Sequence, residues 1–245
     1  MTQRGTPPAE STLLRRLAVL AAVLKIARRH WEWLDHDPLE HLDKPAAGDG
    51  RKRYLSEDER RRLLAACKAS TSPHLYPIVV VALATGMRLG EIRGMRWSDL
   101  SIEPPLAVGL ASLAKTKNGD GRAVAITEPA LSILRNLNAQ RQQARRSQSG
   151  YVFHSSELKG RKPIDIRTPW EGAVKKAKLH NFRFHDLRHT AASYLAMNGA
   201  TPNEIADVLG HKTLSMVMRY VHLSAAHTQN LVARVNEKIF KEFQS

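Results

Sequence analysis

The sequence has a single cysteine and no apolar run long enough to cross a membrane. Because Cys67 has no partner in the chain, no intrachain disulfide can form, which is typical of a protein in a reducing cytoplasm. The apolar stretch at residues 17–24 is closed by Lys25 and Arg28 and lacks a small-residue cleavage site, so we expect neither a membrane span nor an export signal. A Walker motif and an acidic metal cluster are also missing, and we expect no cofactor.

Acidic residues are scarce relative to basic ones. Lys and Arg number 38 against 23 Asp and Glu, which gives a formal net charge of +15 and a pI of about 10.3. A domain this basic commonly binds a polyanion, most often nucleic acid, although a cationic surface can also serve solubility alone. With 245 residues, 42% of them hydrophobic, the chain can form one full domain and a small appendage.

The pattern of apolar residues divides the chain into four segments. Residues 1–11 are polar and are expected to be a disordered lead-in. Apolar residues in steps of three and four predict a helix over residues 12–34, within a segment that extends to residue 42. Residues 43–53 contain proline and glycine and end in a basic run, which indicates a linker on or near nucleic acid. The main domain is expected at residues 54–245.

The main domain is predicted to be mainly α-helical with a small antiparallel β-sheet, an α+β fold. Capping-box patterns at residues 56–59 and 201–204 predict two helix starts. The apolar run at 77–85, closed by Gly86, predicts a buried helix. The other expected elements are a short helix at 88–95, strands at 106–113 and 122–126, a possible third strand at 151–153, a helix that begins near Thr127, a helix at 202–209, and a last helix with an apolar stripe of Leu231, Val235 and Ile239.

Three short clusters in this domain contain candidate catalytic residues. They are Arg88 with Glu91 three positions later, the His-x-x-Arg pair His185 and Arg188, and a Leu-Gly-His triplet at His211 that Tyr220 follows by nine positions. In this order and spacing they resemble the catalytic region of the tyrosine recombinases, the phage-integrase family, from about residue 53 to about residue 235. The resemblance implies the tyrosine-recombinase catalytic-domain fold and double-stranded DNA as the partner.

The resemblance assigns the family's catalytic residues to positions of this sequence. Its two arginines match Arg88 and Arg188, and its nucleophile matches Tyr220. The family also uses a lysine on the turn between two short strands, for which Lys117 is the best match and Lys115 the alternative. The remaining matches are His185, His211 and, at a position where the family often has a supporting acid, Glu91.

These residue types suit the cleavage of a DNA phosphodiester. Two guanidinium groups can bind the nonbridging oxygens and neutralise the charge that builds in the transition state. Because a phenol with a pKa of about 10 attacks poorly, Tyr220 needs a base, for which His185 is a candidate. Lys117 can protonate the departing 5′ oxygen, and His211 can donate a hydrogen bond to the phosphate. The phosphotyrosine product keeps the bond energy, so rejoining needs neither ATP nor metal.

Several of these residues also have simpler interpretations. Tyr220 taken alone would be a core tyrosine, and His189 is interpreted as a structural residue behind the site. His185 and His189 are four residues apart and could bind zinc, but no His-Glu-x-x-His pattern or neighbouring cysteine supports this.

We therefore interpret the chain as a site-specific DNA recombinase or integrase, with two alternatives. One is a DNA-binding remnant or regulator without recombination activity, and the other is a type IB topoisomerase. Family members usually have a helical domain before the catalytic domain, and residues 12–42 resemble only its last helix, so the chain reads as N-terminally truncated. In this family the C-terminal helix links the subunits of a tetramer on DNA, which implies a homo-oligomer, although packing of this helix on its own domain is the alternative.

Overall fold

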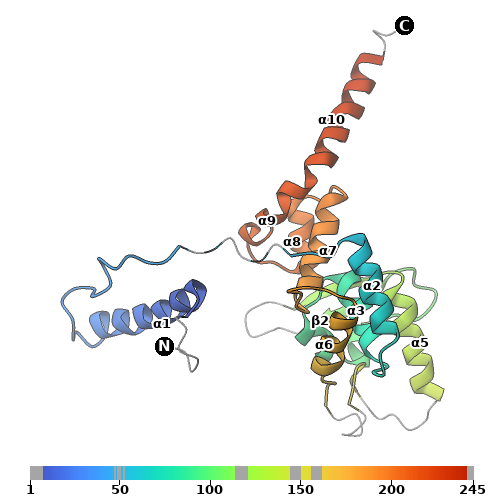
Figure 1. The fold of residues 1–245 in the computed structure, drawn as a ribbon, viewed down its shortest axis with the longest axis horizontal. Helices are drawn as coiled ribbons and strands as arrows, with labels where there is room; N and C mark the ends of the chain where they lie inside the picture. Colours follow the sequence, from blue (N-terminus) through green and yellow to red (C-terminus); the bar gives the residue numbers. More distant parts are fainter. Residues whose placement is uncertain are drawn as a thin grey trace. The chain divides into compact units, whose positions relative to one another are not determined.

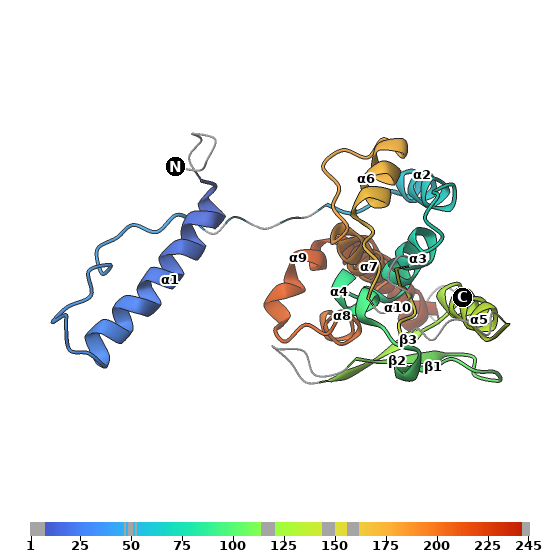
Figure 2. The ribbon, with the colours of Figure 1, turned by 90° about the horizontal axis from the view of Figure 1, so that it is seen from below.

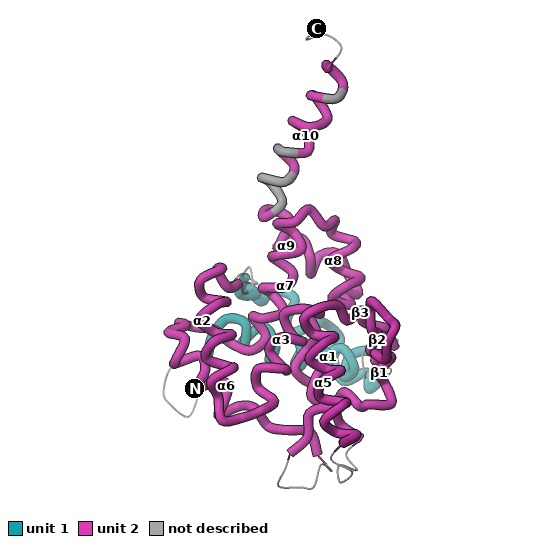
Figure 3. The backbone as a smooth tube through the Cα atoms, turned by 90° about the vertical axis from the view of Figure 1, so that its right-hand side faces the viewer, with its two compact units in different colours: residues 1–51 teal, residues 52–245 magenta. Residues whose placement is uncertain are grey.

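The computed structural model of the chain describes residues 8–46, 48, 51, 53–113, 121–143, 150–155 and 162–241. Contacts within the chain divide it into two compact units, residues 1–51 and 52–245, which Figure 3 shows in two colours. The first unit contains helix α1, and the second contains helices α2 to α10 with a β-sheet.

Helix α1 spans Glu10–Arg29 and is shorter than the sequence predicted. The apolar spacing continues through Trp31, but Glu32 has a left-handed backbone with φ of 56°, which no helix can continue through. The rings of Trp31 and Trp33 instead contact each other beyond the helix, with their centroids 4.5 Å apart. Within α1 Ala27 is buried, whereas Val19 is exposed.

Helix α3 forms the centre of the second unit. It spans Leu75–Thr85 and packs against α2 (Glu57–Lys68), α5 (Ala130–Gln143) and α7 (Asp186–Met197), an arrangement that can be followed in Figures 1 and 2. Because its sequence is apolar on every side, α3 can be surrounded by other elements. This confirms the predicted buried helix, which ends at Gly86 in the left-handed conformation.

A three-stranded antiparallel sheet lies along one edge of this unit, with α5 beside it (Figure 2). Strand β2 pairs with both neighbours, and its Gly109 faces Ile126 at the start of a five-residue register. The strands are β1 (Leu100–Ser101), β2 (Gly109–Leu113) and β3 (Arg122–Ile126).

Strand β3 has the predicted bounds and β2 lies within its predicted range, beginning at Gly109 rather than at residue 106, but the possible strand at residues 151–153 is not formed. The third strand is β1 rather than residues 151–153. Tyr151 forms only an isolated bridge with Arg96, and Val152 donates its backbone N–H to the carbonyl of Met95 at 2.9 Å. The single bridge anchors this segment beside the core without extending the sheet.

Helices α4, α8 and α10 of the second unit lie where the sequence predicted helices. The capping box at Thr201 is confirmed, because its Oγ1 accepts from the backbone of Glu204 at 3.3 Å and α8 begins at Pro202. The elements are α4 (Leu89–Gly94), α6 (Arg167–Lys176), α8 (Pro202–Leu209), α9 (Met218–Val221) and α10 (Ala225–Phe240), with short 3₁₀ segments η1 (Trp97–Asp99), η2 (Leu214–Met216) and η3 (His222–Ser224).

Helix α10 begins next to α7 and runs away from the rest of the unit (Figures 1 and 3). The side chains of its predicted apolar stripe are exposed, at 45% for Leu231, 43% for Val235 and 58% for Ile239. Among the helices that the structure describes, α10 included, none has the length and hydropathy needed to cross a membrane.

Candidate active site

The turn between α3 and α4 presents Arg88. Gly86 ends α3, and Arg88 occupies the N-cap position of α4. Glu91 holds this arginine at two points, since one carboxylate oxygen accepts from the Arg88 backbone N–H and the other from its Nη1, both at 2.9 Å. The Arg88 side chain remains 44% exposed while Glu91 is 10% exposed. The carboxylate therefore fixes the guanidinium without covering it.

Arg188 lies on α7 and reaches back to the same turn. Its Nη1 donates to the Gly86 carbonyl at 2.8 Å, and the residue is only 3% exposed. Its Nη2 is buried and has no hydrogen-bond partner within the described part of the chain. Burial, followed by the charges of Arg88 and Arg122, lowers the pKa of Arg188 to about 10, against the pull of Glu91. A buried cation with a free N–H is costly, which indicates a position suited to an anion.

Arg122 is a member of the site that the sequence analysis missed. Its Nη2 lies 3.2 Å from the Glu91 carboxylate, and its Nη1 donates to the Leu209 carbonyl at 2.5 Å. One guanidinium thus joins β3 to α4 and to the end of α8. The only signal in the sequence is an arginine at the first position of a strand, and its partners are 31 and 87 residues away.

His211 follows the left-handed cap of α8 at Gly210. Its backbone N–H donates to the Ala206 carbonyl at 2.9 Å, which completes the cap. Burial, followed by the charges of Arg188 and Arg88, lowers the pKa of His211 to about 4. The ring is therefore neutral at pH 7 and can donate one hydrogen bond.

Tyr220 lies on α9 and is 4% exposed in a small apolar cluster formed by α7, α8 and α9. Its Oη is 2.5 Å from Nδ1 of His189. The interpretation of His189 as a structural residue behind the site was therefore incomplete, because this ring contacts the phenol directly. Burial raises the pKa of Tyr220, while the charges of Arg219 and Arg188 act in the opposite direction.

His185, the predicted base, occupies the N-cap position of α7, one helical turn before His189. The two rings meet edge to face with centroids 5.2 Å apart. Burial and then the charge of Arg188 lower the pKa of His185. The lysine candidates, Lys117 and Lys115, lie outside the described residues, between the ends of β2 and β3. Within the described ranges, no group of three or more His, Cys, Asp or Glu side chains is placed to hold a metal ion.

The structure therefore brings five of the six predicted catalytic residues into one electrostatic neighbourhood. The charge of Arg188 acts on His185, His211 and Tyr220, which come from α7, the loop after α8, and α9. The charge of Arg88 also acts on both histidines. Cationic and neutral donors gathered in this way can bind an anion next to a buried phenol.

The tight approach at Gly86 gives a stability prediction. A Cβ at this position would lie 2.3 Å from Cδ2 of fully buried Leu209, and its φ of +65° disfavours any side chain. We expect Gly86→Ala to lower the free energy of unfolding by about 2–4 kcal/mol through left-handed strain and overpacking. Urea denaturation followed by circular dichroism measures this change.

Gly90 provides the matched control. It lies inside α4 with open space around the added Cβ, so Gly90→Ala is expected to raise the free energy of unfolding by about 0.5–1 kcal/mol. Equal effects of the two substitutions would contradict the packing observed at Gly86.

Comparisons with known proteins identify the family and the fold of this mostly helical unit. The profile of the phage integrase family matches residues 53–227. The shufflon-specific DNA recombinase of Escherichia coli is 32% identical over 222 residues, which are 90% of this chain and 53% of that protein. The integrase of Salmonella phage P22 is 30% identical over 230 residues, which are 90% of this chain and 56% of that protein. The solved catalytic domain of bacteriophage HP1 integrase aligns with a TM-score of 0.56 and 29% identity, over 74% of this chain and 93% of that domain.

The chain belongs to the phage integrase family of tyrosine recombinases. Its second unit has the tyrosine-recombinase catalytic-domain fold, so both the family and the fold predicted from the sequence are confirmed. The chain spans about half the length of the curated relatives named above.

Proposed function

We propose that this chain is a site-specific DNA recombinase or integrase that cleaves and rejoins strands through a 3′-phosphotyrosine intermediate on Tyr220. The observation that carries the proposal is the free Nη2 of buried Arg188, in a guanidinium whose charge acts on the phenol of Tyr220. Family membership and the net charge of +15 support a DNA substrate.

In this proposal the scissile phosphate binds between the guanidinium groups of Arg88 and Arg188. Arg188 offers its free Nη2 and Arg88 its half-exposed guanidinium to the nonbridging oxygens, while neutral His211 donates one further hydrogen bond. Glu91 and Arg122 do not contact the phosphate; they orient Arg88 and the end of α8.

The strand transfer then exchanges one ester for another. Tyr220 Oη attacks phosphorus and loses its proton to a base, the bond from phosphorus to the 5′ oxygen breaks, and the departing oxygen receives a proton. We assign this last proton to Lys117, which matches the family's lysine. Because one phosphate ester replaces another, a free 5′-hydroxyl can reverse the sequence and rejoin a strand.

Covalent capture tests the proposal. The purified chain is incubated with a pool of duplexes that carry a nick and randomised flanking bases, so that a short 5′ fragment diffuses away after cleavage. We expect a denaturation-resistant protein–DNA adduct, and mass spectrometry of the digested adduct should find the nucleotide on Tyr220. DNA binding without any adduct would favour a DNA-binding regulator without recombination activity. Relaxation of supercoiled DNA that contains none of the captured sequences would favour a topoisomerase.

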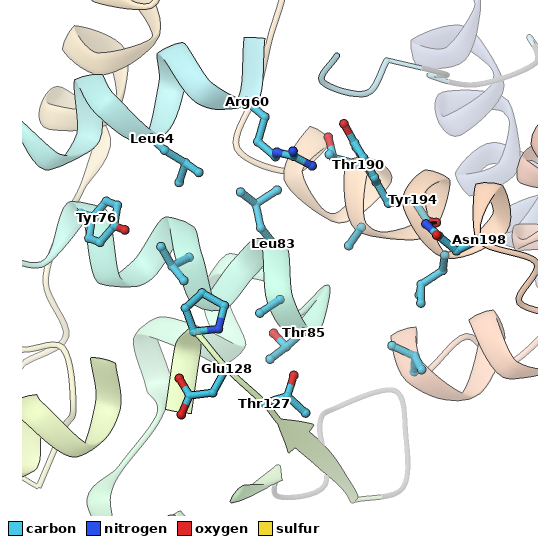
Figure 4. A pocket seen from close by; sticks show the side chains of 16 residues that line it. Arg60, Leu64, Tyr76, Leu83, Thr85, Thr127, Glu128, Thr190, Tyr194 and Asn198 are labelled. Carbon is cyan, nitrogen blue, oxygen red and sulfur yellow. Dashed lines mark hydrogen bonds between the residues drawn. The ribbon is translucent and has the colours of Figure 1, made fainter. Parts of the chain in front are cut away.

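We also propose that copies of the chain associate on DNA through α10. The second unit contains an open groove of about 610 Å³ between α2, α3 and α7, shown in Figure 4. Apolar side chains such as Leu64, Leu83 and Leu195 line it, with Arg60 and Glu128 as charged members. The exposed stripe of α10 is apolar, as is this lining, so the α10 helix of a second copy is the proposed occupant of the groove.

Association through this helix gives a further prediction. Val235→Asp places a charge in the apolar stripe, and we expect it to abolish DNA-dependent oligomers measured by light scattering while leaving covalent capture of a single site intact. Ala233→Asp is the control, because it adds the same charge on the opposite side of α10 and should leave the oligomers unchanged. Oligomers that survive Val235→Asp would show that another surface joins the copies.

A further inference from the structure

The contact between Tyr220 and His189 identifies the proton acceptor for the reaction. Nδ1 of His189 lies 2.5 Å from the phenol oxygen, whereas the ring of His185 meets the ring of His189 edge to face one turn earlier on α7. We propose that His189, rather than His185, is the general base that deprotonates Tyr220. The inference rests on the proposed strand cleavage.

The protonation states of the two rings define the direction of the hydrogen bond. Burial raises the pKa of Tyr220 and lowers the pKa of His189 to about 4, so at pH 7 the phenol is protonated and the imidazole neutral. The phenol O–H therefore donates to Nδ1, and the imidazole proton resides on Nε2. His189 is thus oriented as an acceptor before any substrate binds.

Transfer of this proton balances the cleavage step. As Oη bonds to phosphorus, its proton moves to Nδ1 of His189 and leaves an imidazolium. The departing 5′ oxygen receives a different proton, from the acid assigned above. In the reverse step the attacking 5′-hydroxyl releases its proton to the conjugate base of that acid, and His189 returns its own proton to Tyr220.

Burial and the groups that surround His189 on two helices set the strength of this base. His185, Asp186 and Arg188 face His189 from α7, and Arg219 faces it from α9 next to Tyr220 itself. Burial is the main cause of the low pKa of His189; His185, Arg219 and Arg188 lower this pKa further, and Asp186 opposes them. A bound DNA phosphate adds negative charge beside the same cations, so the proton affinity of His189 increases when the substrate arrives.

Two matched substitutions test the assignment by single-turnover cleavage of the nicked duplexes. His189→Asn keeps a polar atom near the position of Nδ1 but removes its basicity, and His185→Asn makes the same change one turn earlier. We expect His189→Asn to slow cleavage by about 100- to 10,000-fold at pH 7. Its rate should continue to rise with pH, since hydroxide then removes the phenol proton, whereas the wild-type rate levels off. A purely structural role would give a constant loss across the pH range.

A substrate with sulfur in place of the bridging 5′ oxygen distinguishes the loss of a general base from the loss of a general acid. The thiolate leaves without a proton, so the loss of an acid is rescued and the loss of a base is not. We expect His189→Asn to remain slow on this substrate. Rescue by sulfur, a wild-type rate in His189→Asn, or the pH signature in His185→Asn instead would each overturn the inference.

The controls distinguish this inference from the proposed function. If the wild-type chain forms no adduct, the proposed function fails, and the inference fails with it. If the wild type forms the adduct and His189→Asn forms it equally fast, only the inference fails. Circular dichroism melting checks the fold of each variant, and His189→Gln provides a second substitution if His189→Asn does not fold.

Discussion

Tyr220→Phe is expected to abolish covalent capture of DNA. The substitution removes only the phenol oxygen from a side chain that is 4% exposed, so the apolar packing of the ring on α7 and α8 is kept. Without that oxygen no ester with phosphorus can form, and we expect no adduct at any pH or DNA concentration. The lost hydrogen bond to His189 should lower the free energy of unfolding by only about 1 kcal/mol.

The measurement is a denaturing gel of the captured products, run beside a filter-binding assay for DNA affinity. Tyr194→Phe is the matched control, because Tyr194 lies on α7, where its ring packs under Arg60, and it should give a wild-type yield of adduct. An adduct that forms with Tyr220→Phe would show that another residue is the nucleophile. Loss of DNA binding together with the adduct would point to misfolding.

Arg188→Met is expected to slow cleavage by about 100- to 1,000-fold without a loss of stability. Arg188 is 3% exposed, its Nη2 has no partner among the described residues, and its pKa falls to about 10. Keeping this charge buried therefore lowers the stability of the folded protein. Methionine fills a similar volume without the charge, although the Gly86 carbonyl loses a donor. We expect the free energy of unfolding to stay unchanged or rise by up to about 2 kcal/mol.

Arg188→Lys completes this experiment. Lysine keeps a buried positive charge but loses the forked geometry, so cleavage should fall without the gain in stability that methionine can give. Single-turnover rates and urea denaturation of both variants measure the two effects. If Arg188→Met lowered the free energy of unfolding by several kcal/mol, the arginine would be a structural residue and not one held for an anion.

Local patterns in the sequence predicted the parts of the fold that depend on neighbouring residues. The capping box at Thr201 and the left-handed cap at Gly210 delimit α8 at the predicted residues, because both signals act within one turn of backbone. The apolar run before Gly86 predicted α3 for the same reason. The end of α1 was missed because periodicity continues through Trp31, although the backbone turns at Glu32.

Contacts between segments that are far apart in the chain could not be predicted from the sequence. Arg122 looked like an ordinary strand residue, and its role as a link between Glu91 and Leu209 depends on how β3, α4 and α8 pack. His185 and His189 share a helix, so spacing alone could not tell which ring faces Tyr220. That choice depends on where α9 lies against α7, at a separation of 31 residues.

Helix α7 carries the phosphate-binding candidate Arg188 and the proton acceptor His189 at adjacent positions. The helix fixes an angle of about 100° between the directions of these two side chains, and this angle cannot change without unwinding the helix. Any movement of α7 therefore displaces the phosphate-binding group of Arg188 and the base His189 together.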